Sequence, residues 1–175
     1  WKVWNGTYWK PDRKRQVYHF ATEVCRKRQK QSMSLKDSRD KKELFNFAVQ
    51  SENIHKIKSM LERASGLEGL ATISEDWDKD PLLFQCPNGV VILNDQKFVE
   101  GKPEWMISQS SEVEYDLTAE CPVFDKFILD IMDGDEELAN YLLMCMGYSL
   151  NGSTDEQCMF LLVGDGSNGK SVLLE

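Results

Sequence analysis

The chain has 175 residues, of which 41% are hydrophobic and 29% are charged, a composition typical of a folded globular protein. Its longest apolar run is far shorter than the ~20 residues that a membrane-spanning helix needs, so we expect no membrane partner. The five cysteines are scattered and include no C-x-x-C pair, which argues against a disulfide framework and against a zinc site.

The net charge of −8 conceals an uneven distribution along the chain. Residues 1–50 contain 13 Lys and Arg against 5 Asp and Glu, whereas residues 66–175 contain 5 against 22. A basic N-terminal part suits contact with the phosphates of DNA. A solvated helix face that neutralises the acidic remainder explains the same pattern, and both interpretations stay open.

The first nine residues predict a β-hairpin that turns at Asn5-Gly6, a dipeptide that favours tight turns. Four aromatic rings lie in this stretch: Trp1, Trp4, Tyr8 and Trp9. The favoured interpretation is that they pack together to close a hairpin or lid, because an isolated two-stranded hairpin needs such packing to persist. The alternative is that they stack on the bases of single-stranded DNA, with Lys2 and Lys10 near its phosphates.

Three helices are predicted between Pro11 and Gly66. The first carries apolar residues at helical spacing from Val17 to Cys25. A polar loop over residues 31–40 separates it from the other two. The candidate DNA-binding residues are the basic side chains before and along the first helix: Arg13, Lys14, Arg15, Arg26, Lys27, Arg28 and Lys30. They would attract phosphates without reading the base sequence.

The two later helices of this part are predicted over residues 41–50 and 51–64. After Gly69 the pattern changes to short strands, at residues 82–86 and 90–93, with an edge strand at residues 97–99. One more extended segment is expected over residues 106–115, and then two helices over residues 122–132 and 136–148.

The last stretch matches the phosphate-binding pattern G-x-x-x-x-G-K-[ST], with Gly164, Gly169, Lys170 and Ser171 at its fixed positions. The apolar run at residues 159–163 predicts a buried strand before the loop. In such a loop the backbone N–H groups surround a phosphate chain, Lys170 reaches the β- and γ-phosphates, and Ser171 helps to hold Mg²⁺. A Gly- and Ser-rich surface turn is the alternative, but the order of strand, glycine loop and helix favours a nucleotide site.

The chain stops at Glu175, four residues after Ser171, and begins at Trp1 rather than at Met. A complete P-loop motor also needs further parallel strands and a second acidic motif. We therefore expect a fragment of a larger nucleotide-driven protein. ATP and Mg²⁺ would serve the parent protein, whereas the fragment itself is expected to hold no nucleotide and to be inactive.

Several motifs, taken in order, resemble those of one family. They are Trp4-Asn5-Gly6 with Trp9, Asp78-Lys79-Asp80-Pro81, Pro87-Asn88-Gly89-Val90, Cys121-Pro122 with Phe127, Gly147-Tyr148-Ser149-Leu150-Asn151-Gly152, and Gly164 with Gly169-Lys170-Ser171. Similar motifs occur in phage- and plasmid-encoded primase–helicases, which are similar to the poxvirus replicative primase–helicase and have a superfamily 3 motor. The resemblance implies nucleotide binding by six residues of the loop: Gly164, Gly166, Asn168, Gly169, Lys170 and Ser171.

The predicted fold class is α+β. We expect a linker or aromatic hairpin over residues 1–12, and a mainly helical domain with a small β-hairpin region over residues 13–150. Residues 151–175 would form the first strand and phosphate loop of a truncated AAA+ α/β domain.

The resemblance implies a part of a replicative primase–helicase that precedes the motor and supports ATP-dependent DNA unwinding. It further implies a homo-oligomeric ring, encoded by a phage or mobile element and acting on DNA in the cytoplasm of a bacterial host. Two other classes stay open. One is an oligomerisation or docking collar without direct DNA contact. The other is a small-molecule kinase, which is disfavoured because a kinase usually has its phosphate loop near the start of the fold.

Overall fold

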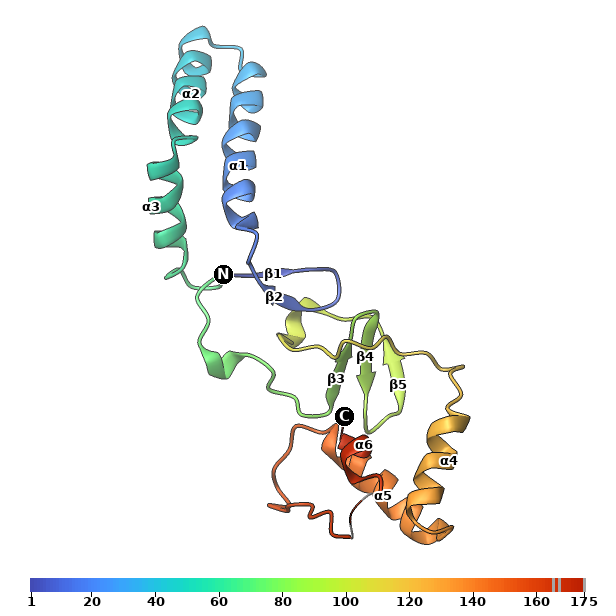
Figure 1. The fold of residues 1–175 in the computed structure, drawn as a ribbon. Helices are drawn as coiled ribbons and strands as arrows, with labels where there is room; N and C mark the ends of the chain where they lie inside the picture. The colour runs from blue at the N-terminus through green and yellow to red at the C-terminus, as the bar shows by residue number, and fades with distance from the viewer. Residues whose placement is uncertain (165, 167, 175) are drawn as a thin grey trace. The chain divides into compact units, whose positions relative to one another are not determined.

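The computed structural model describes residues 1–164, 166 and 168–174; Asp165, Ser167 and Glu175 lie outside the described residues. The chain forms two compact units, residues 1–79 with 102–109 and residues 80–101 with 110–175. Its described part is mainly helical with two small antiparallel sheets, which confirms the predicted α+β class (Figure 1). No helix in this part is long and apolar enough to span a bilayer. The boundaries predicted at residues 12 and 150 stay a prediction.

The first unit begins with the predicted hairpin. Strands β1 (Lys2–Trp4) and β2 (Trp9–Pro11) pair antiparallel. The Asn5 side chain shapes the turn, because its Oδ1 accepts a hydrogen bond from the Tyr8 amide at 2.8 Å. Gly6 has a φ of 107°, a backbone conformation that glycine adopts without steric cost. The Asn-Gly dipeptide therefore makes this turn.

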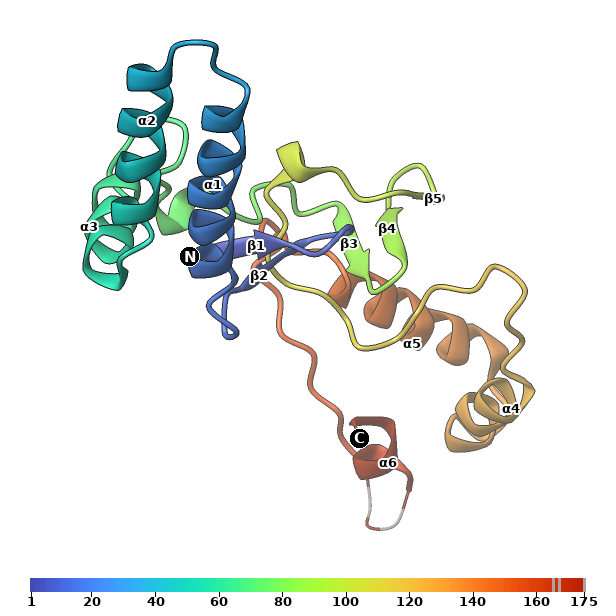
Figure 2. The same cartoon turned by 90° about the horizontal axis from the view of Figure 1, so that it is seen from above.

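Three helices follow, as predicted: α1 (Gln16–Met33), α2 (Ser38–Ser51) and α3 (Ile54–Ala64). We call them the helical arm. Helices α2 and α3 run one after the other along α1, and both contact it (Figures 1 and 2). The side chains of Asp37 and Asn53 cap the N-termini of α2 and α3 by accepting backbone N–H groups. These caps fix where each helix begins.

The interior of the helical arm is small. Its buried apolar side chains are Ala21, Cys25, Ala48 and Ile57. Phe20 and Val24, which follow the same helical spacing as Ala21 and Cys25, remain 48% and 51% exposed. The arm therefore retains apolar surface on α1 that its own helices do not cover.

Residues 102–109 return to the hairpin from a distant part of the sequence. The Trp9 amide donates to the Ile107 carbonyl at 2.9 Å, and the Trp9 indole N–H donates to the Pro103 carbonyl at 2.9 Å. The Asp78 carboxylate accepts from both the amide and the hydroxyl of Ser108, each at 2.6 Å. These bonds hold the hairpin, the returning segment and the stretch around Asp78 together.

The second unit contains a three-stranded meander of β3 (Leu83–Cys86), β4 (Gly89–Ile92) and β5 (Lys97–Val99). This order confirms the predicted strand, turn and strand with β5 at the edge. Val90 is fully buried. Residues 106–115, predicted to be extended, belong to no strand of the described chain.

The two predicted helices of the second unit are α4 (Pro122–Ile131) and α5 (Glu136–Ser149). Pro122 occupies the first turn of α4, where its missing N–H costs no hydrogen bond. Their contact buries Ile128, Ala139 and Leu142, which form the core of this part.

The strand predicted at residues 159–163 is absent: residues 158–164 have no regular secondary structure. Met159 and Val163 are 85% and 83% exposed. A strand requires a hydrogen-bonded neighbour, and no described strand pairs with this stretch. The predicted helix after the loop is present as α6 (Lys170–Leu174), and its Leu173 packs against the core of α4 and α5.

Candidate functional site

All seven basic residues predicted to contact DNA are exposed, and they lie in two groups. Arg13, Lys14 and Arg15 form the turn before α1. The Asp12 carboxylate holds this turn by accepting the amides of Gln16 and Val17 at 2.7 and 2.9 Å. Burial acts to raise the pKa of Asp12, but these hydrogen bonds outweigh it and keep the pKa below its ordinary value.

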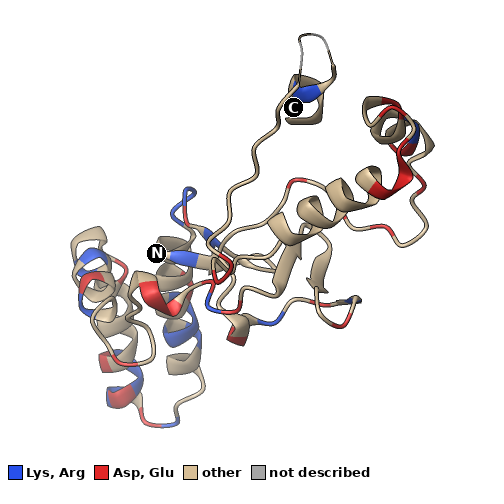
Figure 3. Ribbon diagram, turned by 90° about the horizontal axis from the view of Figure 1, so that it is seen from below, with Lys and Arg blue, Asp and Glu red and all other residues tan. Residues whose placement is uncertain are grey.

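The second group lies in the C-terminal half of α1 and does not form one face. Successive residues of an α-helix are rotated by ~100°, so Arg26 and Lys30 share a side whereas Lys27 and Arg28 point elsewhere. Acidic residues also occur along the helical arm, and Figure 3 shows both charges mixed along it. The structure therefore spreads this group around the helix.

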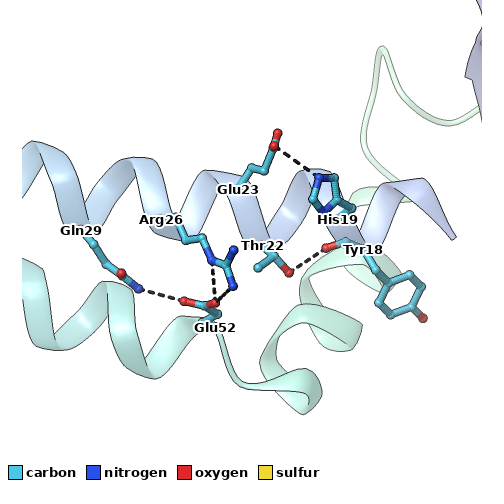
Figure 4. Close-up of polar contacts among 7 residues, drawn as sticks. All are labelled: Tyr18, His19, Thr22, Glu23, Arg26, Gln29 and Glu52. Atoms are coloured by element: carbon cyan, nitrogen blue, oxygen red, sulfur yellow. Dashed lines mark hydrogen bonds and ion pairs between the residues drawn. The ribbon is translucent and has the colours of Figure 1, made fainter.

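Arg26 bridges α1 to the turn between α2 and α3 (Figure 4). Its Nε and Nη2 both lie 2.9 Å from Oε1 of Glu52, while Gln29 Nε2 donates to Oε2 at 3.0 Å. Two hydrogen bonds lower the pKa of Glu52: the bond from Gln29 has the larger effect, and the bond from Arg26 has the next largest. This role of Arg26 was not predictable from the sequence, because 26 residues separate Arg26 from Glu52 and no short-range pattern connects them.

In the predicted phosphate loop, the side chain of Lys170 forms hydrogen bonds to other residues of the same loop. Lys170 Nζ donates to the Gly164 carbonyl at 2.9 Å and to Oδ1 of Asn168. The structure thus brings three of the predicted site residues together, at the start of α6. Ser171, the predicted Mg²⁺ contact, is exposed in the first turn of that helix.

The glycines of the loop differ in whether the structure leaves space for a larger residue at their positions. Gly169 has a φ of 81°, and a Cβ there would lie 2.6 Å from Cγ2 of Ile131 and 3.3 Å from Cε2 of Phe127. Gly169 is therefore needed both for its backbone conformation and for its contact with α4. A Cβ on Gly166 would meet no atom within 4 Å. The loop positions Asp165 and Ser167 lie outside the described residues.

A cavity of about 550 Å³ adjoins the loop within the second unit. Side chains of α5, the stretch at residues 159–163 and Lys170 line it. Hydrogen bonding to Cys145 raises the pKa of Tyr141 in its wall. Among the described residues there is no group of three or more His, Cys, Asp or Glu arranged to hold a metal ion. Mg²⁺ at Ser171 depends on bound ATP and stays a prediction.

Two motifs that carry the family resemblance have structural roles. The Asn88 amide is bonded twice to the backbone of Tyr115: its Nδ2 donates to the carbonyl at 2.9 Å, and its Oδ1 accepts the amide at 3.0 Å. Gly152 donates its amide to the Pro81 carbonyl at 3.0 Å, and a Cβ on it would touch the Pro81 ring at 3.4 Å. These residues position backbone segments rather than a ligand.

The chain is similar to two curated viral proteins. It is 29% identical over 152 residues to "Putative helicase L207/L206" of Acanthamoeba polyphaga mimivirus, a match to 79% of this chain and 16% of that protein. It is 28% identical over 118 residues to "Putative helicase 184R" of Invertebrate iridescent virus 6, covering 65% of this chain and 12% of that protein. The chain thus spans less than a fifth of the length of either relative.

A family model described as "D5 N terminal like" matches residues 1–133. This match covers both the helical arm and the three-stranded sheet, and it continues through α4. Together with the two viral relatives, it confirms the resemblance to primase–helicases of the poxvirus type. The chain belongs to the D5 N-terminal-like family.

Proposed function

We propose that this chain is the part of a viral or mobile-element primase–helicase that precedes the ATPase motor, and that it supports ATP-dependent DNA unwinding in replication. The observation that carries the proposal is the family match over residues 1–133, followed by the Gly-Lys-Ser pattern at residues 169–171. The names of both viral relatives support it. We propose that the protein acts on DNA in the cytoplasm of the host cell.

In the longer protein, ATP would be held by the loop residues Gly164, Gly166, Asn168, Gly169, Lys170 and Ser171. The positive φ of Gly169 and the start of α6 at Lys170 support this assignment, because the pattern requires a glycine turn that leads into a helix. Lys170 would contact the β- and γ-phosphates, and Ser171 would hold Mg²⁺. Residues 159–163 would become a strand only beside the other strands of an AAA+ sheet.

Hydrolysis by P-loop enzymes needs an acidic Walker B residue and a group that orients water, in addition to the phosphate loop. In the longer protein we propose a homo-oligomeric ring, in which this part lies before the motor.

A second candidate function is a collar that docks subunits or partners without touching DNA. Two observations favour it. Arg26 forms an ion pair with Glu52. Lys27 and Arg28 point to different sides of α1, so the basic residues do not form one positively charged face. The half-exposed side chains of Phe20 and Val24 offer apolar area for docking.

A titration with labelled single-stranded DNA at low and moderate salt separates the two candidates. The DNA-contacting function predicts binding that weakens steeply as salt rises, through release of counterions. The double charge reversal Lys27→Glu with Arg28→Glu should weaken this binding. The matched control reverses Lys97 and Lys126 in the acidic second unit and should change it less. Absence of binding at low salt would support the collar.

A further inference from the structure

A cavity of about 770 Å³ lies within the first unit. Three tryptophan rings line it: Trp1 and Trp9 from the hairpin, and Trp77 from the segment after the helical arm. A volume of this size is within the range of ~300–1,000 Å³ in which proteins bind small organic groups. Trp1 is 48% exposed, so packing within the protein leaves part of its surface open to solvent.

Two of these rings are held in place by hydrogen bonds. The Trp9 indole donates to the Pro103 carbonyl at 2.9 Å, and the Trp77 indole donates to Oγ1 of Thr72 at 3.2 Å. The Trp9 and Trp77 centroids are 5.9 Å apart with their planes at 76°, an edge-to-face contact. The walls are therefore fixed by contacts that already exist, which lowers the entropic cost of stacking a ligand against them.

A cation covers the Trp77 ring. Lys2 Nζ lies 3.9 Å from its centroid, at the distance of a cation–π contact. The lysine side chain is long and flexible, so it can leave the ring when a flat group takes its place. An ammonium beside a stacked base is also suitably placed for the phosphate of the same nucleotide. Asp78, the carboxylate that lines the cavity, already accepts two hydrogen bonds from Ser108.

We propose that this cavity accepts one unpaired base of single-stranded DNA on the Trp77 ring, and that Lys2 moves from the ring to the adjoining phosphate. The inference rests on the proposed function, since it assumes that the chain contacts DNA. It differs from the charge-based contact on α1, because it requires the base and not only the backbone. Stacking of this kind accepts any of the four bases.

The test compares an oligothymidine of about 12 nucleotides with an abasic strand of the same length, at low salt. Fluorescence anisotropy of the labelled strands gives the affinities. Trp77→Ala should weaken binding of oligothymidine by about tenfold or more, given the usual effect of removing one stacking ring. Trp77→Phe should retain most of the affinity, and the abasic strand should bind the wild type and Trp77→Ala equally weakly.

The chain offers matched controls in the same unit. Trp105 lies beneath Lys102, whose Nζ is 5.2 Å from the ring centroid, and neither residue is among the described residues that line the cavity. Trp105→Ala should leave the affinity unchanged. Lys2→Ala should lower the salt dependence by about one counterion, whereas Lys102→Ala should not. Near-ultraviolet circular dichroism and thermal unfolding of Trp77→Ala, read beside Trp77→Phe, separate loss of stacking from loss of the fold.

The outcomes separate this inference from the function on which it rests. If the wild type binds oligothymidine and the abasic strand equally, the base site is wrong while DNA contact through the chain stands. If thymidine monophosphate binds as tightly as the oligomer, the cavity is a free-nucleotide site and the strand assignment is overturned. If the wild type binds no strand at low salt, DNA contact by this chain is wrong, and the base site fails with it.

Discussion

Two glycine-containing motifs of the second unit are held in different ways: the Asn-Gly turn at residues 87–90 and the phosphate loop at residues 164–171. In the turn, Asn88 bonds the backbone of Tyr115, which is 27 residues away, and Val90 is fully buried. In the loop, Lys170 donates to the Gly164 carbonyl and to the Asn168 side chain, which lie within six residues of it. The apolar stretch before the loop is exposed.

This difference separates a motif that shapes the fold from a motif that, under the proposed function, binds a nucleotide. The residue that Asn88 of the turn bonds, Tyr115, lies in the same unit, so contacts within this unit determine the geometry of the turn. Gly169 of the loop lies close to Ile131 and Phe127, and Leu173 of the following helix packs against the core of α4 and α5. Under the proposed function, the remaining partners of the loop are a nucleotide and the further strands of an AAA+ sheet. Substitutions in the two motifs should therefore affect different measurements.

The largest expected effect on stability is that of Gly89→Ala. A Cβ at this position would lie 2.6 Å from the Val99 carbonyl oxygen, a backbone atom that cannot move without disturbing β5. We expect a loss of about 2–3 kcal/mol in the free energy of unfolding. Gly166→Ala is the matched change in the loop and should alter the free energy by no more than about 0.5 kcal/mol. Urea unfolding of both variants measures their free energies of unfolding. Equal losses in the two variants would contradict the expected difference between the turn and the loop.

Asn88→Ala should have the next largest effect. It removes both hydrogen bonds to Tyr115, and each is worth about 1 kcal/mol. Asn88→Asp keeps the acceptor but places a carboxylate oxygen, which cannot donate, against the Tyr115 carbonyl, so it should not restore the stability of the wild type. A stability unchanged in Asn88→Ala would show that the segment around Tyr115 is held by its other contacts, such as the stacking of Phe98 on Tyr115 at 5.0 Å.

Gly169→Ala should act locally. Its φ of 81° and the close approach of Ile131 both disfavour a Cβ, so α6 should detach from α4 while the rest of the unit stays folded. Hydrogen exchange at the Leu173 amide, which donates to the Gly169 carbonyl at 2.9 Å, should become faster. The midpoint of global thermal unfolding should shift little. A large shift of that midpoint would mean that the loop is as integral to the fold as the Asn-Gly turn.

The smallest expected effect is the pH dependence of the helical arm. The hydrogen bonds from Gln29 and Arg26 lower the pKa of Glu52 below its ordinary 4.5. The stability that they contribute is therefore present above that value and is lost as pH falls through the lower pKa of the folded state.

Thermal unfolding followed by helical circular dichroism at neutral and acidic pH measures this dependence. Glu52→Gln should reduce it. Glu62→Gln, a change at an exposed glutamate of α3, should leave it as in the wild type. Identical pH dependence in both variants would show that Glu52 does not stabilise the arm.

Much of the fold was predictable from local signals. Three signals act over only a few residues, and each element that they predict is present. They are the turn at Asn5-Gly6, Pro122 in the first turn of α4, and the apolar spacing around Ala21 and Cys25. The strand at residues 159–163 was predicted from apolar composition alone. Composition does not provide a hydrogen-bonding neighbour, and the described chain has none for this stretch.

The candidate sites were predictable only in part. The Gly-Lys-Ser pattern located a loop whose lysine does lie beside Gly164 and Asn168. The seven basic residues were chosen by charge, but a partner 26 residues away decides the role of Arg26. Trp77 was not grouped with the hairpin rings, because the contact between them depends on residues 102–109 returning to Trp9. Such long-range contacts leave no mark in the local sequence.

The most direct test of the proposed function is strand separation by the protein translated from the complete gene. A forked DNA substrate is incubated with ATP and Mg²⁺, and the released strand is measured for the wild type, Lys170→Ala and the control Lys126→Ala, a change at an exposed lysine of α4. The proposed function predicts ATP-dependent release that is lost in Lys170→Ala and retained in Lys126→Ala. Strand release that persists in Lys170→Ala, or its absence in the wild type, would contradict it.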